Sequence, residues 1–448
     1  MKQLDLINSS INEVNTSEFL ESDSYLSTIS KAGFKIIEVD AGDITFLGGQ
    51  NESVHRWFRL TPSYSPSLVR FFLEKFEVNK SETILDPFSG RGTTVIECQK
   101  RGYQAVSVEL NPLFKIVGEY SLIYNNDNIE LFDNYLILLK DVLEKNRDKD
   151  LETILDEYKL EVPDIHDVFR WWKKDVLKDL LLAKYIAEYS QFSKIKCYLW
   201  LALNMSSLEC ANIHRNHPTI SFDDNHNREI NVFDDLQNRI NNIYQDLLSE
   251  EIDTWKTVNN KVILGNSIEI EEIFAKYDYK SKFNVVITSP PYPNRFSYIH
   301  QTRPQLHFMD VIKDRKEATE LDLKAIGGTW GRATSILMKE LIEVPDHLKD
   351  ILSYYAELSG KSTLMCNYAT KYFIDIDKHI KGLKNVLAKD ARGTYVVGNS
   401  RLSGVEIHTE IILAKILEQH GLRVTEILVF RKRGGRKKLY ETAVCFTN

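Results

Sequence analysis

The sequence predicts an α/β fold with a mostly parallel sheet, and three observations support this. Residues 83–109 alternate between a strand, a Gly-rich turn, a helix and a second strand, which is a βαβ unit. Three more strand-like runs follow later in the chain, at residues 261–264, 284–287 and 394–397. The chain also ends in two strands, at residues 423–430 and 442–446, which we expect to form an antiparallel hairpin that closes the sheet.

Residues 127–255, in contrast, are expected to be largely helical. Apolar side chains recur there at spacings of three and four, which places them on one face of a helix. These side chains are Phe169, Trp172, Val176, Leu180, Ala183 and Ala187. Further helices are expected at residues 198–208 and 408–420. Residues 1–50 carry mixed helix and strand signals and no motif, so their role stays unknown at this point.

Length and composition predict a cytoplasmic globular protein of two or three domains. The chain has 448 residues, of which 43% are hydrophobic and 27% charged. No apolar run reaches the roughly 18 residues that span a bilayer, and residues 1–10 do not form a secretion signal. The five cysteines lie far apart without a Cys-x-x-Cys pair. This argues against a zinc site and a disulfide framework, and it favours reducing cytoplasm.

The first candidate site is the segment from Asp86 to Thr94, where a strand leads into a helix. Gly90 and Gly92 let the backbone pass close to a ligand, and the start of a helix offers N–H groups. In open α/β sheets, ligands bind beyond the carboxyl ends of the strands. The segment lacks the G-x-G-x-x-G pattern, so a bound pyrophosphate is not implied.

A second acidic residue supports a ligand site at this edge. Glu109 ends the next strand, 23 positions after Asp86. A carboxylate about 20 residues beyond such a loop is where a ribose diol is bound. The alternative is that Glu109 caps the turn at residues 111–112. We favour ribose binding because the Gly-rich turn precedes it.

The third candidate site is residues 288–292, directly after a strand. Two consecutive prolines remove two backbone donors and fix both φ angles, so the neighbouring carbonyls are rigidly directed. Ser289 adds a hydroxyl acceptor and Tyr292 adds a flat ring. A planar amino group would be held between these acceptors while its ring stacks on the tyrosine. The alternative is an ordinary turn that ends a strand.

These segments together resemble the motifs of a known family, the amino-methylating DNA methyltransferases. Residues 86–94 resemble the family's cofactor motif, and residues 288–292 resemble its catalytic motif in the Ser-Pro-Pro-Tyr form typical of cytosine-N4 enzymes. Residues 56–66 resemble the segment before the cofactor motif, and residues 264–267 resemble the strand end that faces the adenine of the cofactor. The resemblance covers residues 55–115 and 260–300, and more loosely residues 385–448.

The resemblance implies a Rossmann-like class I methyltransferase sheet, S-adenosylmethionine as cofactor and no metal. The implied catalytic residues are Ser289, Pro290, Pro291 and Tyr292. The implied cofactor-binding residues are Asp86, Pro87, Phe88, Ser89, Gly90, Gly92, Thr93, Thr94, Glu109, Asn266 and Thr288.

Two features depart from the usual pattern of this family. Asn266 stands where Asp is usual, although it keeps a hydrogen-bonding side chain. The cofactor half also precedes the catalytic half, with Thr288 179 positions after Glu109, whereas many cytosine-N4 enzymes have the opposite order. The observed order matches the arrangement in which a recognition segment separates the halves. The domains expected are a cofactor half at residues 51–126, a helical insertion and candidate DNA-recognition region at 127–255, and a catalytic half at 256–448, with residues 300–349 as a second candidate recognition region.

The net charge of −7 does not by itself suggest DNA binding, but local charge matters more than the total. Residues 431–438 contain six cations in eight positions. The alternative is a solvated hairpin turn. The candidate DNA-binding residues are Arg431, Arg433, Arg436, Lys437 and Lys438.

The function predicted is methylation of the N4 amino group of cytosine in double-stranded DNA, in a restriction-modification or other defence system. A restriction endonuclease or other defence proteins are the partners implied, and no membrane is. The target base must be flipped out of the duplex, because its amino group is unreachable inside the stack. Two alternatives remain. One is an adenine-N6 DNA methyltransferase, and the other is a cofactor-binding DNA-recognition subunit without catalysis.

Overall fold

The computed structural model describes residues 11–12, 24–39, 49, 51–59, 63–214, 219–223, 228–249, 255, 258–277, 282–328, 331–339, 341–433 and 439–448. Within these residues the chain forms one large sheet and a separate two-stranded hairpin. None of the described helices combines the length and the apolar character that crossing a bilayer requires.

The large sheet contains nine strands within the described residues, in the order β1-β2-β10-β11-β7-β6-β3-β4-β5. These strands are β1 (Ile11–Asn12), β2 (Ile36–Val39), β3 (Thr83–Asp86), β4 (Gln104–Glu109), β5 (Lys261–Leu264), β6 (Phe283–Thr288), β7 (Leu387–Gly398), β10 (Arg423–Arg433) and β11 (Leu439–Thr447). The separate hairpin pairs β8 (Ser400–Leu402) with β9 (Val405–Ile407).

The order of the central strands confirms the predicted fold class. We renumber the seven strands β3, β4, β5, β6, β7, β10 and β11 from 1 to 7 in chain order. Starting at β5, their order in the sheet is then 3-2-1-4-5-7-6. Strand β11 runs antiparallel to both of its neighbours, whereas β7, β6, β3, β4 and β5 are mutually parallel. This is the Rossmann-like, mostly parallel sheet with a C-terminal antiparallel hairpin that the sequence predicted.

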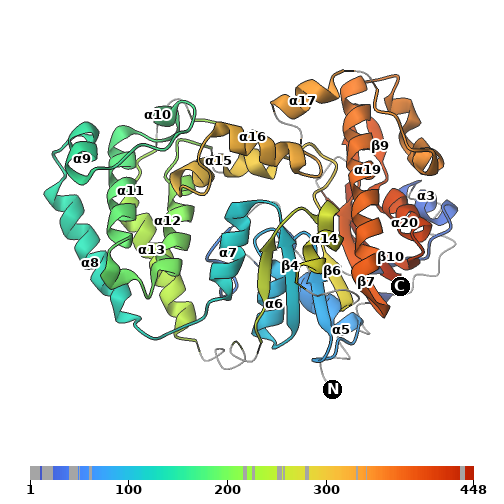
Figure 1. The fold of residues 1–448 in the computed structure, drawn as a ribbon, viewed down its shortest axis with the longest axis horizontal. Coiled ribbons are helices and arrows are strands. Elements are labelled where there is room, and N and C mark those ends of the chain that lie inside the picture. The colour runs from blue at the N-terminus through green and yellow to red at the C-terminus, as the bar shows by residue number, and fades with distance from the viewer. Residues whose placement is uncertain are drawn as a thin grey trace.

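Helices cover both faces of this sheet, and further helices form a block beside it (Figure 1). They are α3 (Ser24–Lys31), α5 (Pro66–Lys75), α6 (Thr93–Lys100), α7 (Pro112–Leu122), α8 (Glu130–Lys145), α9 (Leu151–Tyr158), α10 (Val168–Trp171), α11 (Lys174–Ala187), α12 (Lys196–Glu209), α13 (Val232–Leu247), α14 (Ile270–Ala275), α15 (Tyr298–Phe308), α16 (Arg315–Lys324), α17 (Arg332–Leu337), α18 (Lys349–Leu352), α19 (Thr363–Val386) and α20 (Thr409–Gln419). Short 3₁₀ turns are η1 (Ser190–Phe192), η3 (Ser267–Glu269), η4 (Asp346–Leu348) and η5 (Ser353–Leu358).

Side chains on the buried strands alternate between the two faces, as the period of two in a strand requires. In β3, Leu85 packs with α19 and α20, whereas Ile84 packs with α5 and α6 on the opposite face. Val286 and Val285 of β6 divide in the same way. Both faces are therefore buried, which explains why these strands read as continuous apolar runs rather than as alternating ones.

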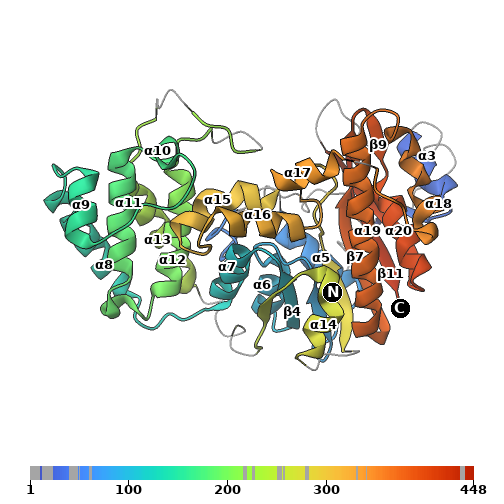
Figure 2. The ribbon, with the colours of Figure 1, turned by 45° about the horizontal axis from the view of Figure 1, so that its top comes forward.

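Helices α8 to α13 form a block with its own hydrophobic core, and this core continues into α7 and α15. Figure 2 shows this block at one end of an elongated molecule, with α15 and α16 reaching from it across the central strands toward α19. The block occupies the sequence between α7 and β5. It thus interrupts the crossover from β4 to β5, which is the edge strand beyond β4.

One buried carboxylate joins the helical block to the rest of the chain. Asp246 of α13 accepts hydrogen bonds from the backbone N–H of Val54 at 3.0 Å and from the indole N–H of Trp57 at 2.7 Å. It also forms an ion pair with Arg56. A buried charge with these partners is well compensated, so it fixes how the block meets residues 54–57.

Two expectations from the sequence need correction. The final hairpin does not close the sheet, because β2 pairs parallel with β10 and β1 pairs with β2 beyond it. Part of the N-terminal segment thus covers an edge whose N–H and C=O groups would otherwise be unpaired. The apolar stripe is also not one helix face. Phe169 lies on α10 and is 43% exposed, because the helix breaks at Trp172 before α11 begins.

Candidate active site

The candidate site lies where the order of the parallel strands reverses. Strands β3 and β6 are neighbours, and their carboxyl ends are Asp86 and Thr288. The connections that leave them go to opposite sides, which is where open α/β sheets form a ligand crevice. A cavity of about 270 Å³ lies here, and residues from both predicted motifs line it.

Asp86 lies beneath this cavity and joins the elements around it. One carboxylate oxygen accepts hydrogen bonds from the Thr288 hydroxyl at 2.6 Å and from the Phe88 amide at 3.1 Å. The other accepts from the hydroxyls of Thr94 at 2.6 Å and Tyr64 at 3.3 Å. The side chain is fully buried, and this burial raises its pKa although the hydrogen bonds oppose the rise.

The turn after β3 wraps around the end of β4. The Ser89 amide donates to the Val108 carbonyl at 3.0 Å, and the Gly90 amide donates to the Glu109 carboxylate at 2.7 Å. Gly90 has a φ of +52°, which disfavours other residues, and a Cβ atom built there meets nothing within 4 Å. This glycine therefore leaves open space on the backbone side that borders the cavity.

Glu109 lines the cavity and has two backbone partners. Besides the Gly90 amide, its carboxylate accepts from the Asn111 amide at 2.7 Å. Both sequence interpretations thus describe part of its environment, since Glu109 caps the following turn and also borders the cavity. Burial raises the pKa of Glu109 to about 8, against the lowering effect of these two hydrogen bonds.

Asn266 borders the same cavity at the end of β5. Its side-chain oxygen accepts from the Ile268 amide at 3.2 Å, and its side-chain nitrogen donates to the Lys324 carbonyl at 3.1 Å. The first of these hydrogen bonds starts a 3₁₀ turn, which is a role that an aspartate could also perform. The second joins the strand end to the C-terminal end of α16.

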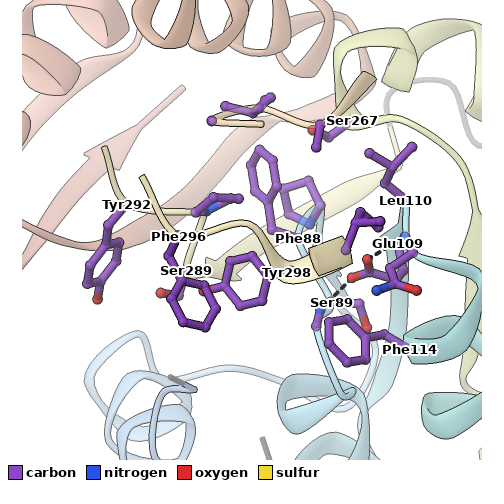
Figure 3. Close-up of a pocket in the computed structure, with 18 of the residues that line it drawn as sticks. Phe88, Ser89, Glu109, Leu110, Phe114, Ser267, Ser289, Tyr292, Phe296 and Tyr298 are labelled. Atoms are coloured by element: carbon purple, nitrogen blue, oxygen red, sulfur yellow. Dashed lines mark hydrogen bonds between the residues drawn. The ribbon is translucent and has the colours of Figure 1, made fainter. Parts of the chain in front are cut away.

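The segment after β6 faces the cavity from the other side. Figure 3 shows Glu109 and Leu110 on one side and Ser289 and Tyr292 on the other, with the ring of Phe88 between them. Among the described residues, none donates a hydrogen bond to the Ser289 hydroxyl or to the Pro290 carbonyl. The Ser289 hydroxyl borders the cavity and is therefore available to a ligand that carries an amino group, whereas Pro290 does not line the cavity.

The structure brings most of the predicted site residues to this cavity, but not all of them. The predicted residues that line it are Pro87, Phe88, Ser89, Gly90, Thr93, Glu109, Asn266, Ser289, Pro291 and Tyr292. The predicted residues that do not line it are Asp86, Gly92, Thr94, Thr288 and Pro290. Four of these five lie in the layer beneath the cavity. They are Asp86, its hydroxyl partners Thr94 and Thr288, and Gly92, which caps the start of α6.

Several lining residues were missed in the sequence. Arg91 stands inside the first motif, where its buried guanidinium donates to the carbonyls of Phe58 at 3.0 Å and His55 at 2.5 Å. Its position within the motif was a signal that could have been used. No signal marks residues from α15, α16 and the turns beside them, because their approach depends on tertiary packing. The missed lining residues include Ser63, Tyr64, Asn111, Phe114, Asn294, Phe296, Ser297, Tyr298, Asp322 and Gly327.

Part of the basic run lies outside the described residues, including Arg436, Lys437 and Lys438. Arg431 and Arg433 belong to β10, where they pair with Glu441 and Leu439 of β11. Glu441 is among the residues that line the cavity. The strand that follows the basic run, β11, therefore reaches the cavity.

We predict that Asp86→Ala lowers the free energy of unfolding by about 2–4 kcal/mol, because it removes the carboxylate that accepts four hydrogen bonds beneath the cavity. Urea unfolding of the purified variant measures this loss. Asp86→Asn is the matched control, since it keeps one acceptor oxygen and the same volume. The hydroxyls of Thr94 and Tyr64, which donate to the second carboxylate oxygen in the wild type, can rotate so that they accept from the amide nitrogen of the asparagine. Equal stability of the Ala and Asn variants would contradict the structural role.

The chain is similar in sequence to several Type II methyltransferases. It is 22% identical to M.BsoBI of Geobacillus stearothermophilus over 88% of this chain and 83% of that protein. It is 22% identical to M.AvaI of Nostoc sp. over 91% of this chain and 89% of that protein. It is also 22% identical to M.MvaI of Kocuria varians, over 83% of this chain and 82% of that protein.

No protein-family model matches the chain. A solved structure of the rRNA methyltransferase aviRa from Streptomyces viridochromogenes aligns with 9% identity over 91% of this chain and 93% of that one, with a TM-score of 0.30. The sequence similarity covers most of this chain and most of each of these three Type II methyltransferases.

Proposed function

We propose that this protein transfers a methyl group from S-adenosylmethionine to the exocyclic amino group of cytosine (N4) in DNA. One observation carries the proposal. The Gly-rich turn after β3 and the Ser-Pro-Pro-Tyr segment after β6 line one cavity, although Ser289 comes 199 positions after Gly90 in the sequence. The similarity to Type II methyltransferases supports the reaction class. A restriction-modification or other defence system is the proposed setting.

The residues on the Glu109 side fit this cofactor. The Glu109 carboxylate supplies acceptors for ribose hydroxyls, and Asn266 supplies a polar side chain at the neighbouring strand end. Open space beside Gly90 admits a ligand close to the backbone. Phe88 adds an apolar surface, and its ring is held against buried His379 at a centroid distance of 4.7 Å. These groups would hold the ribose, the adenine and the amino-acid part.

The residues on the Ser289 side fit an amino group on a planar ring. The Ser289 hydroxyl and the Pro290 carbonyl would accept hydrogen bonds from the two amino hydrogens, which favours a pyramidal and more nucleophilic nitrogen. Tyr292 would stack on the flipped base. The bound cofactor supplies an activated methyl group on a charged sulfonium, so the protein's contribution is positioning and electrostatics.

A covalent enzyme intermediate is not part of this proposal. No cysteine is among the described residues that line the cavity. Burial also raises the pKa of Cys210 and Cys445 to about 12, so these thiols stay protonated. Direct attack by the base nitrogen needs no such nucleophile.

We also propose that the helical block takes part in DNA recognition. Residues 127–255 and residues 300–349 are the two candidate recognition regions, and α15 and α16 from the second region contribute lining residues to the cavity. Figure 2 shows the helical block beside the sheet, and α15 and α16 extending from it over the central strands. Basic side chains on either region would bind phosphates and fix the register of the duplex.

Transfer of labelled methyl from S-adenosylmethionine to DNA tests the proposed reaction directly. Label in DNA rejects a non-catalytic recognition subunit, which the intact Ser289–Tyr292 segment already disfavours. Nucleoside analysis of the product then separates N4-methylcytosine from N6-methyladenine, which is the second candidate because serine at position 289 biases the base choice without fixing it. Absence of labelled DNA across mixed-sequence substrates would reject the proposed activity.

We predict that Ser289→Ala lowers the single-turnover rate of methyl transfer about a hundredfold while cofactor affinity changes little, since the serine hydroxyl acts on the amino group during attack. Tyr292→Ala should lower the rate and also weaken capture of the base, because stacking contributes about 1–3 kcal/mol per base. Ser121→Ala, in a buried position of α7 away from the cavity, is the control. A wild-type rate in folded Ser289→Ala would reject the catalytic assignment.

We predict that affinity for S-adenosylmethionine rises with pH up to about 8, because ribose hydroxyls donate to ionised Glu109. Below a pKa of about 8 the free site holds a proton that binding must release, so the affinity gains at most about tenfold per pH unit. Calorimetric titrations from pH 6 to 9 measure the slope. Glu109→Gln keeps the shape of the side chain but removes its titratable carboxyl group. Any pH dependence of the affinity that remains in this variant then comes from the cofactor's own ionisation. Identical slopes in the two proteins would contradict the assignment.

We predict that replacing Arg436, Lys437 and Lys438 by glutamine reduces the salt dependence of DNA binding. The slope of log affinity against log salt should fall by about 0.9 for each phosphate that the variant no longer neutralises. The matched control replaces three exposed lysines of α19 and the start of β7, Lys378, Lys381 and Lys389. If both triple variants keep the wild-type slope, the basic run is a solvated turn.

A further inference from the structure

Helix α19 presents two buried tyrosines to the segment that follows β6. The Tyr372 hydroxyl donates to the Pro291 carbonyl at 2.7 Å. The Tyr368 hydroxyl accepts from the Arg295 amide at 3.0 Å. The tyrosines are four residues apart, so they share one face of the helix, and their two backbone partners are also four residues apart. The pair therefore brackets the segment that contains Tyr292.

The hydrogen bond to Pro291 acts on the one backbone torsion that the prolines leave free. The rings of Pro290 and Pro291 fix both φ angles. The proline at 291 also restricts ψ of Pro290 to extended values. What remains is ψ of Pro291, which sets the direction of its carbonyl and of the chain leading to Tyr292. A hydrogen bond from Tyr372 to that carbonyl defines this torsion.

The hydrogen bond from Arg295 fixes the other end of the segment. Arg295 has a φ of +61°, which is rare for a residue with a side chain, so the chain reverses sharply there. The Asn294 amide donates to the Tyr292 carbonyl at 2.8 Å within the same reversal. An amide at a strained position needs a partner to hold it, and the Tyr368 hydroxyl is that partner.

A third segment of the cavity rests on the same pair. Gly327 lines the cavity with a φ of +77°. A Cβ atom built there would lie 3.3 Å from the Tyr368 hydroxyl and 3.7 Å from the Tyr372 ring. Burial raises the pKa of Tyr368 to about 12, so its hydroxyl keeps its proton across the working range of pH. The two tyrosines thus adjoin both the cavity wall after β6 and the turn after α16.

We propose that Tyr368 and Tyr372 are positioning residues that set the Ser289–Tyr292 segment in the geometry needed for methyl transfer. This inference rests on the proposed function. Neither tyrosine lines the cavity, so they act through Pro291 and Arg295 rather than on the substrate. A displacement of the segment by about 1 Å would misplace the amino group relative to the methyl donor, which is enough to cost up to about a hundredfold in rate.

The test removes single hydroxyls and keeps the rings. Tyr372→Phe should lower the single-turnover rate ten- to a hundredfold, while cofactor affinity stays within about twofold of wild type. Tyr355→Phe is the matched control. Tyr355 is also buried, and its hydroxyl pairs with the Thr370 hydroxyl of α19 at 3.3 Å, but it does not hydrogen-bond to the segment after β6. A rate for Tyr372→Phe within twofold of this control would overturn the inference.

Hydrogen exchange supplies a readout that does not depend on activity. In Tyr368→Phe, the Arg295 amide has no acceptor, so a peptide covering residues 293–297 should exchange at least about tenfold faster than in wild type or in Tyr355→Phe. Unchanged exchange would overturn the inference even if the enzyme is active. If wild-type protein methylates no DNA, the proposed function fails by itself, and the exchange result still decides whether the tyrosines hold the segment.

Discussion

The carboxylate of Asp86 is the point on which the architecture of the site depends. It accepts hydrogen bonds from the end of β6 through Thr288, from the first turn of α6 through Thr94, and from Tyr64 before α5. A buried carboxylate is tolerated only when such partners compensate its desolvation, so the three elements are held in one arrangement. Because Thr288 directly precedes Ser289, the Gly-rich loop after β3 and the candidate catalytic segment are positioned by the same group. The geometry beneath the cavity is thus set by polar groups, although the sheet around it is held by apolar packing.

The sequence was sufficient to predict the parts of the molecule that local chemistry determines. Apolar runs bounded by turn residues located β3, β4, β6 and the final hairpin, because strands buried on both faces have no other pattern available. The two loops at Gly90 and Ser289 were found because glycine and proline act on the backbone where they stand. Their meeting in one cavity followed from a rule of topology, since the carboxyl ends of parallel strands share an edge.

The remaining features depend on interactions that no local pattern encodes. Residues 1–50 carry mixed helix and strand signals and no motif, yet β2 pairs with β10, because strand pairing across nearly 400 residues is a property of the packed sheet. Phe169 fitted a helical stripe but is exposed, since the helix breaks at Trp172. Tyr368 and Tyr372 look like ordinary core residues of an amphipathic helix, and only their hydroxyl partners distinguish them. Asp86 was placed in the cofactor site, but its side chain lies below the cavity because three hydroxyls and an amide converge on it.

The helical block and the cavity are connected through a short turn that precedes both motifs. Asp246 of α13 holds Val54 and Trp57 on one side of this turn. On the other side, Arg91 of the Gly-rich loop after β3 donates to the carbonyls of His55 and Phe58. Arg91 itself lines the cavity. An insertion between α7 and β5 is far from the Gly-rich loop in sequence, but both make hydrogen bonds to the same turn at residues 54–58. The position of the block is for that reason fixed relative to the cavity wall, and a duplex held by the block would meet the cavity in a defined orientation.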